Sequence, residues 1–223
     1  MKTYYDKLFA SQEGTQLYKT FIRNHAQGHT LLELACGTGD LLNELKESFS
    51  VKGVDLDESM LALGYEKYPE LADKMVQGDF LTYEDDTVYD TLVCVGDSLN
   101  YILTEEDLLK FVNQSVKLSN CILLDCHHPF RLTEFADDYY EEGSTDDFDY
   151  AYQIEVDGEH LVHVINFLDG TFDSVYQWVF NPQILIDAYE KQGYHVTVLT
   201  DFEQPGITQE GEKLMFVIRK ELI

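Results

Sequence analysis

The chain has 223 residues, enough for one ordinary globular domain with a substantial core. Its 15 Lys and Arg residues stand against 42 Asp and Glu residues, which gives a formal net charge of −27. A field of that sign repels phosphate backbones, so the composition argues against nucleic acid as a substrate or partner. The same acidity would attract a cationic or amine-bearing molecule, although a well-solvated surface is the simpler explanation.

The cysteines and the apolar segments indicate the compartment. Each of the four cysteines stands alone in an apolar run, without the C-x-x-C spacing of a zinc site or the framework of a disulfide-rich protein. They are predicted to be buried free thiols in a reducing environment. No apolar stretch has the length of a signal-peptide core or a membrane span, so a cytoplasmic protein that does not associate with membranes is predicted.

Strands and helices alternate through the first half of the chain. Two helices are predicted at about 3–10 and 13–26. The predicted strands that follow are 30–35, 50–55, 74–79, 89–96 and 120–126, and the predicted helices between them are 38–47, 57–67 and 104–118. Thr104 and Asp107 have the spacing of a capping box. This alternation is typical of βαβ units, so we expect a doubly wound α/β sheet, mostly parallel and covered on both faces.

The pattern changes after residue 126. Residues 137–149 contain seven acidic residues and no basic residue, which predicts an exposed loop or a mobile lid. Residues 150–180 contain two Asp-Gly dipeptides between alternating segments, which predicts a three-stranded antiparallel meander. A helix at 182–192 and strands at 195–202 and 212–220 then resume the α/β pattern. We therefore expect one domain that carries an insertion after its fifth strand.

Small residues follow the first predicted strand. The segment ELACGTG, residues 33–39, leaves a buried strand and opens a helix, so Ala35, Gly37 and Gly39 are expected at the carboxyl edge of the sheet. Small side chains there let a ligand contact the backbone. Asp55 ends the second strand, where an acidic residue accepts hydrogen bonds from ribose hydroxyls. A tight strand-to-helix turn with no ligand is the alternative explanation.

The next two strands end in similar residues. GDF (78–80) supplies an acid and an aromatic ring that suit an adenine amino group and ring face, and GDSLNY (96–101) supplies a polar cluster. Four consecutive strand ends with small, acidic or amide side chains predict one shared ligand site.

These motifs together resemble a known family. LLELACGTGDLL (31–42), GVDLDESML (53–61), GDF and YDTLVCVGDSLNYI (89–102) are similar to the successive motifs of class I S-adenosylmethionine-dependent methyltransferases. The fold that this resemblance implies has seven strands, of which the last is antiparallel. It divides the single domain (1–223) into N-terminal helices (1–29), a cofactor-binding core (30–126), the lid and β insertion (127–180) and the completion of the core sheet (181–223).

The resemblance implies roles for individual residues. The residues at the methionine end of S-adenosylmethionine would be Glu33, Ala35, Cys36 and Gly37. The ribose would be bound by Asp55, and the adenine by Leu56, Met60, Asp79 and Phe80. The residues near the sulfonium and the carboxylate would be Gly96, Asp97 and Tyr5. Ala35 occupies a position that is often Gly in the first motif.

The motif DSLNY and the β insertion resemble small-molecule methyltransferases such as the amino-sugar N-methyltransferases more than the nucleic-acid enzymes, and the chain has no N-P-P-Y segment. We therefore expect a small-molecule acceptor, with nitrogen, oxygen and sulfur nucleophiles all open. The edges of the meander could pair across a two-fold axis in a homodimer.

Catalytic residues are less well defined by the sequence. His127 and His128 directly follow the fifth strand, so at least one is expected to face the cofactor cleft and act as a base; a histidine that caps the backbone before Pro129 is the alternative. His163 is expected to pack in the core of the meander. Tyr176 and Trp178 are expected to pack on the core, with a substrate-stacking wall as the alternative.

Two other functions share some of these sequence features. A nicotinamide-dependent dehydrogenase shares the strand-loop-helix and the ribose-binding acid, but its short-chain form needs a Tyr-x-x-x-Lys pair, which the chain lacks. A non-catalytic module that binds S-adenosylmethionine also fits, because methyl transfer depends mainly on positioning and needs few fixed catalytic groups.

Overall fold

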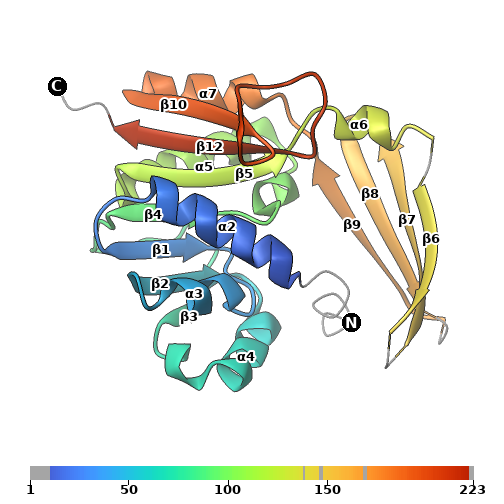
Figure 1. Ribbon diagram of the computed structural model, residues 1–223, viewed down its shortest axis with the longest axis horizontal. Coiled ribbons are helices and arrows are strands. Elements are labelled where there is room, and N and C mark those ends of the chain that lie inside the picture. The colour runs from blue at the N-terminus through green and yellow to red at the C-terminus, as the bar shows by residue number, and fades with distance from the viewer. Residues whose placement is uncertain (1–10, 138, 146–147, 168–169, 221–223) are drawn as a thin grey trace.

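The chain forms two sheets in the computed structural model, which describes residues 11–137, 139–145, 148–167 and 170–220 (Figure 1). The larger sheet has eight strands in the order β11-β10-β12-β5-β4-β1-β2-β3, and the smaller has four strands in the order β6-β7-β8-β9. The arrow of β1 in Figure 1 points toward the smaller sheet, so the carboxyl edge of the large sheet faces that second sheet.

The large sheet has the predicted topology. Its strands are β1 (Thr30–Leu34), β2 (Ser50–Asp55), β3 (Met75–Gln77), β4 (Thr91–Cys94), β5 (Cys121–His127), β10 (Tyr194–Thr200), β11 (Gln204–Pro205) and β12 (Lys213–Lys220). Strands β1 to β5 pair in parallel, and β12 runs antiparallel to both β5 and β10. This confirms the doubly wound fold with an antiparallel last strand. The two-residue edge strand β11 was not predicted.

Helices cover both faces of this sheet. They are α2 (Gln12–His25), α3 (Asp40–Leu45), α4 (Glu58–Lys67), α5 (Glu105–Leu118) and α7 (Pro182–Lys191). The short helix α6 (Arg131–Glu134) lies beside the second sheet instead (Figure 1), and the 3₁₀ turns are η1 (Pro69–Leu71) and η2 (Ser98–Tyr101). Apolar residues of α2, α3 and α4 share one buried cluster with the sheet, and those of α5 and α7 share the other. The three layers follow from the amphipathic pattern of the helices and from strands such as β5, which is buried throughout.

Local signals explain where the helices begin. The Thr104 side chain accepts a hydrogen bond from the backbone N of Asp107 (3.2 Å), so the predicted cap of α5 is confirmed. Asp57 and Asn181 cap α4 and α7 in the same way. The helix predicted at 3–10 lies outside the described residues.

The second sheet corrects one prediction. Its strands are β6 (Tyr139–Ser144), β7 (Asp149–Asp157), β8 (His160–Phe167) and β9 (Phe172–Trp178), all antiparallel. The meander predicted over 150–180 is confirmed as β7, β8 and β9. The loop or lid predicted over 137–149 is wrong for residues 139–144, because β6 pairs along β7 and makes the insertion four-stranded.

Phenol groups explain how an acidic segment forms strand β6. The hydroxyl of Tyr139 donates to Glu141, and that of Tyr140 donates to Glu142, two residues further on the same face of the strand. Each carboxylate therefore has a hydrogen-bond donor beside it, and the exposed edge carries charge, as edge strands commonly do. The number of acidic residues in this segment does not predict these tyrosine–glutamate hydrogen bonds.

Two expectations about the chain as a whole were also tested. The cysteines are free and buried, as expected: Cys36, Cys94, Cys121 and Cys126. Within the described ranges, no helix combines the length and the apolar character needed to cross a membrane.

Candidate active site

A cavity of about 870 Å³ opens at the carboxyl edge of the large sheet and is also lined by residues of α2 and β9. That volume lies in the upper part of the range for sites that hold one drug-sized molecule, so it leaves space for a second, smaller one. Ten residues implied by the resemblance line it: Glu33, Ala35, Cys36, Gly37, Asp55, Leu56, Met60, Asp79, Phe80 and Gly96. Tyr5 lies outside the described residues.

The loop after β1 needs small residues for its backbone. Ala35, Gly37 and Gly39 all have left-handed φ angles, of 58°, 55° and 80°. A Cβ atom on Gly39 would stand 2.6 Å from the sulfur of Met75, so close packing excludes a side chain there as well. Ala35 adopts a conformation that glycine adopts without strain, which accounts physically for the frequent glycine at that motif position.

Asp55 is fixed by two backbone hydrogen bonds. Its Oδ2 accepts from the N of Gly37 (2.7 Å), and its Oδ1 accepts from the N of Asp57 (2.8 Å). A carboxylate has about four acceptor positions, and these two hydrogen bonds fix the direction in which both oxygens point. The side chain is therefore oriented at the cavity wall and can accept hydroxyl donors such as the two of a ribose.

Glu33 is a buried carboxyl group at the base of the cavity. The residue is 4% exposed, and its Oε2 has no hydrogen-bond partner among the described residues. Burial raises the pKa of Glu33 well above its usual range, and the nearby charges of Asp55 and Asp40 raise it further. A buried acceptor without a donor is costly, so this atom fits the ammonium group of an amino acid ligand.

The opposite part of the cavity is more apolar. Leu56 is 66% exposed at its mouth, and the terminal methyl of Met60 lies 3.7 Å from the position of a Cβ on Gly37. The Phe80 ring packs edge-on against Phe111, with 5.5 Å between centroids, and Oδ1 of Asp79 accepts from the N of Leu81 (2.8 Å). These groups form an apolar wall beside an oriented carboxylate, which suits a purine ring.

Asp97 belongs to a polar cluster beside the cavity. The residue has a left-handed φ of 62°, and its carboxylate pairs with the ammonium of Lys213. Its backbone N donates to Oδ1 of Asp125 (3.1 Å), and Tyr18 of α2, which lines the cavity, donates its hydroxyl to Oδ2 of Asp125. Asp97 itself is not one of the lining residues, although Gly96 and Ser98 are.

The two carboxyl groups of this cluster titrate in opposite directions. Burial opposes the ionisation of both. At Asp97 the charge of Lys213 outweighs burial and lowers the pKa, whereas at Asp125 burial prevails, assisted by the charge of Asp97, and raises the pKa. Sequence reasoning missed Tyr18, Asp125 and Lys213. Only Asp125 carried a signal, as an acid inside the apolar run CILLDC.

Neither predicted catalytic histidine lines the cavity. The ring of His127 is buried at the end of β5, with Nε2 2.8 Å from Oε1 of Gln177 and Nδ1 3.6 Å from Oδ1 of Asp97. Burial lowers the pKa of His127, although Asp97 opposes that shift. His127 thus contacts the groups beside the cavity, and the expected direct exposure to the cleft is not found.

His128 caps the backbone. Its Nδ1 accepts from the N of Phe130 (3.0 Å), and its Nε2 lies 3.1 Å from the carbonyl oxygen of Thr208. Both ring nitrogens are engaged by the backbone, so the capping alternative is correct for His128, and its expected orientation toward the cleft is wrong. Burial lowers the pKa of the ring.

Three aromatic residues of the second sheet, His163, Tyr176 and Trp178, are expected from the sequence to be core or substrate-stacking residues. The Nδ1 of His163 lies 2.6 Å from the hydroxyl of Tyr152, and burial lowers the pKa of His163 to about 4. Trp178 is buried against Phe180, with 5.4 Å between centroids, whereas Tyr176 is exposed. Neither Tyr176 nor Trp178 lines the cavity, so they do not form a wall of it.

Asn100 joins the two sheets. It is fully buried, its Oδ1 accepts from the N of His127 (3.0 Å), and its Nδ2 donates to the carbonyl of Trp178 (2.7 Å). One side chain thus ties the end of β5 to the end of β9, which lines the cavity with Asp173 and Val175.

We expect Asn100→Ala to lower the free energy of unfolding by roughly 2–4 kcal/mol, because it leaves a buried N–H and a buried carbonyl without partners. Urea unfolding followed by circular dichroism measures the change. Asn113→Ala, at an exposed asparagine of α5, is the control and should change stability by less than about 0.5 kcal/mol. Equal effects of the two substitutions would show that Asn100 does not join the sheets.

Known proteins share both the sequence pattern and the fold. The sequence profile of the family described as "Methyltransferase domain" matches residues 31–119. The YqeM protein of Bacillus subtilis (strain 168), to which a methyltransferase activity is ascribed, is 27% identical over 97% of this chain and 94% of its own length. A crystal structure of an S-adenosylmethionine-dependent methyltransferase from Clostridium acetobutylicum ATCC 824 has a TM-score of 0.84, at 18% identity, over 98% of this chain and 97% of that one.

A further solved structure is the sugar N-methyltransferase KedS8 from Streptoalloteichus sp. ATCC 53650, with a TM-score of 0.74 and 21% identity over 97% of this chain and 93% of that one. The strand order and the glycine-rich loop of this chain are consistent with the match to the methyltransferase profile. Residues 31–119 thus match the methyltransferase family, and the fold of the whole chain is similar to that of S-adenosylmethionine-dependent methyltransferases.

Proposed function

We propose that this protein transfers a methyl group from S-adenosylmethionine to a small-molecule acceptor in the cavity at the carboxyl edge of the large sheet. The observation that carries the proposal is the pairing of a buried, unpartnered Glu33 oxygen with a backbone-fixed Asp55 carboxylate in one cavity. A cofactor that has an ammonium group at one end and a ribose further along satisfies both.

We assign the remaining cofactor contacts to the other lining residues. The loop with Ala35, Cys36 and Gly37 would hold the methionine end through its backbone. Leu56, Met60 and Phe80 would surround the adenine, with Asp79 at its edge. Gly96 would lie near the sulfonium, because no atom of the described residues stands within 4 Å of the position that a Cβ on Gly96 would take. Tyr5 stays a prediction for the carboxylate end.

The cofactor supplies a methyl group bound to a positively charged sulfur. The chain then has to hold the acceptor in line with that group and exclude water, and positioning of this kind can account for about 7–11 kcal/mol of a barrier. Tyr18 and Tyr101 line the cavity in which the acceptor would be held. A nitrogen acceptor is favoured because similar solved structures include N-methyltransferases of a sugar and of a glycopeptide.

We assign His127 the role of a positioning residue, because it contacts Asp97 and Gln177 and does not line the cavity. His127→Ala is expected to lower kcat by about ten- to a hundredfold while the Kd for S-adenosylhomocysteine stays within a factor of two, because Asp97 loses a neighbour that orients it. His127→Gln, which keeps a donor, should restore most of the rate. Steady-state kinetics and calorimetry measure both constants.

The pH profile distinguishes positioning from catalysis. If His127 orients its neighbours, the pH dependence of kcat keeps its shape in His127→Ala at a lower amplitude. Loss of the acidic limb in the variant would instead identify His127 as the general base and contradict this role.

Partners and location are proposed from the composition of the chain and from the edges of the second sheet. We propose that nucleic acid is not the acceptor, since a net charge of −27 opposes its approach, and that the enzyme acts in the cytoplasm. A homodimer through an edge of the second sheet is also proposed, because among the described strands β6 and β9 each pair on one side only.

Methyl transfer is tested by following S-adenosylhomocysteine formation against a panel of small amines and alcohols.

A further inference from the structure

The second sheet presents one face to the cofactor cavity. Asp173 and Val175 of β9 line the cavity, and the strand register extends that face across the sheet. Alternate residues of a strand share a face, so the residues opposite Asp173 and Val175 belong to it. We call this the inner wall. Two of its rows are Glu141, Tyr152, Ile165 and Asp173, and Tyr139, Ile154, His163 and Val175.

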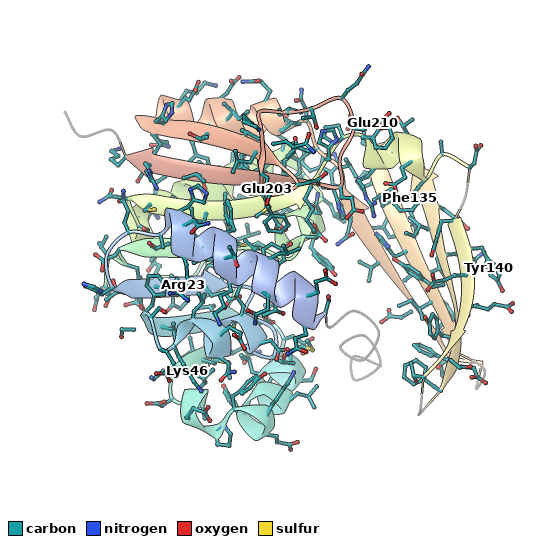
Figure 2. All side chains as sticks on the ribbon, in the orientation of Figure 1. Arg23, Lys46, Phe135, Tyr140, Glu203 and Glu210 are labelled. Carbon is teal, nitrogen blue, oxygen red and sulfur yellow. The ribbon has the colours of Figure 1, made fainter. Side chains whose placement is uncertain are left out.

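The orientation of neighbouring residues agrees with this assignment. Figure 2 shows Phe135 of the α6 region on the side of the sheet that faces the core and Tyr140 on the outer side. Phe135 shares a buried cluster with Ile154 of the inner wall, and Tyr140 is 54% exposed. The inner wall thus carries tyrosines, aliphatic residues and His163, with an acid in each of its two edge strands, Glu141 in β6 and Asp173 in β9.

Asp173 is the uncompensated acid of this wall. Among the described residues, its one hydrogen bond comes from the neighbouring N of Ser174 (2.9 Å), and no ion pair involves it. Glu141 differs, because it accepts from the hydroxyls of Tyr139 and Tyr150. Asp173 therefore presents a carboxylate to the cavity with acceptor positions still available.

The rest of the cavity has the same sign of charge. The described residues that line it include seven acids and no Lys, Arg or His: Glu33, Asp40, Asp55, Asp57, Asp79, Asp107 and Asp173. Arg131 lies nearby, in a separate cavity, and its guanidinium is paired with Glu134 at 2.6 Å. An anionic ligand in the large cavity would thus meet several carboxylates and no free cation of the described lining.

Resting on the proposed function, we propose that the methyl acceptor is an amine whose protonated amino group is held by Asp173 on the inner wall, and that phosphate-bearing molecules are rejected. Tyr101, which lines the same cavity, suits such a cation, because aromatic faces attract it. Transfer to the amine nitrogen requires loss of one proton to water. The carbon–nitrogen bond then forms from the nitrogen lone pair, and the electron pair of the carbon–sulfur bond stays on sulfur.

The first test uses matched acceptors with the full-length protein. Aromatic amines, alkyl amines and free amino sugars are each compared with the analogue that has a hydroxyl in place of the amine and with a phosphate ester that keeps the amine. Formation of the methylated product is followed by mass spectrometry. We expect at least one amine to be methylated and its phosphate ester to have a kcat/KM at least about tenfold lower.

Three outcomes of this panel contradict the inference. These are equal or better turnover of phosphate esters, turnover confined to alcohols, and no turnover of any amine by protein that binds S-adenosylmethionine. Failure to bind S-adenosylmethionine at all would instead contradict the proposed function, so the two failures are distinguishable by calorimetry.

The second test addresses Asp173 directly. Asp173→Asn should raise the KM of the methylated amine by about tenfold and leave the Kd for S-adenosylhomocysteine unchanged, because only the charge that holds the acceptor is lost. Asp173→Glu keeps the charge and should retain more of the affinity. Asp157→Asn, at an exposed acid of β7 that does not line the cavity, is the matched control and should leave KM unchanged. An unchanged KM in Asp173→Asn, with a melting temperature like wild type, would overturn the role of Asp173.

Discussion

Asp55→Ala is expected to weaken the binding of S-adenosylmethionine by about 10- to 100-fold. In the proposed binding mode, the substitution would remove charge-assisted hydrogen bonds to the two ribose hydroxyls, a loss of ~1.5–3 kcal/mol. The structure adds a second reason, because Asp55 also accepts from the N of Gly37 and the N of Asp57 and so holds two loops of the cavity. Isothermal titration calorimetry with S-adenosylmethionine and S-adenosylhomocysteine measures the change.

Asp90 offers a matched control. Its Oδ2 accepts from the backbone N of His29 (2.7 Å) and of Thr30 (2.9 Å) just before and at the start of β1, remote from the cavity lining. Asp90→Ala should therefore reduce stability, with cofactor affinity unchanged. If both variants bound the cofactor as wild type does, Asp55 would have no role in binding it.

Glu33→Gln is expected to affect affinity and stability differently. The substitution preserves shape but removes the charge that would pair with the cofactor ammonium, so the Kd for S-adenosylmethionine should rise by about tenfold or more. The unliganded protein should be at least as stable as wild type near pH 7, because a buried group that resists ionisation is replaced by a neutral one. If Glu33→Gln is as stable as wild type or more stable, but binds S-adenosylmethionine more weakly, the carboxyl group of Glu33 serves binding and not stability.

The raised pKa of Glu33 also predicts how the stability of the protein depends on pH. The pKa of Glu33 is raised in the folded state, so the folded protein retains a proton that the unfolded chain loses above its own pKa of about 4.3. Glu33 therefore contributes a fall in the free energy of unfolding as pH rises above that value, until its raised pKa is passed. In Glu33→Gln the fall should be smaller. Urea unfolding at several pH values measures the difference, and parallel curves for the two proteins would contradict the burial argument.

Most of the large sheet could be predicted because its signals are local. Buried apolar runs and amphipathic stretches alternate from Thr30 to Cys126, and the capping residues of the helices occur where the periodicity changes. The cavity lining was predictable for the same reason, since the ends of parallel strands meet at one edge and the motif residues occupy those ends.

The missed features depend on contacts between distant segments. Strand β6 was predicted to be a loop because charge count takes no account of the tyrosine hydroxyls that donate to Glu141 and Glu142. The cluster around Lys213 joins residues of α2, β5 and β12, which no short window of sequence brings together. The orientation of His128 depends on a backbone carbonyl of Thr208, far along the chain.

We expect the cavity at the carboxyl edge of the large sheet to bind S-adenosylmethionine. Thermal unfolding of the full-length protein with S-adenosylhomocysteine and, in parallel, with NAD tests this claim most directly, because a ligand that binds only the folded state raises the melting temperature. We predict a concentration-dependent increase with S-adenosylhomocysteine and none with NAD. An increase with NAD alone would contradict the binding of S-adenosylmethionine. It would favour the alternative of a nicotinamide-dependent dehydrogenase, which also uses an acidic residue to bind ribose.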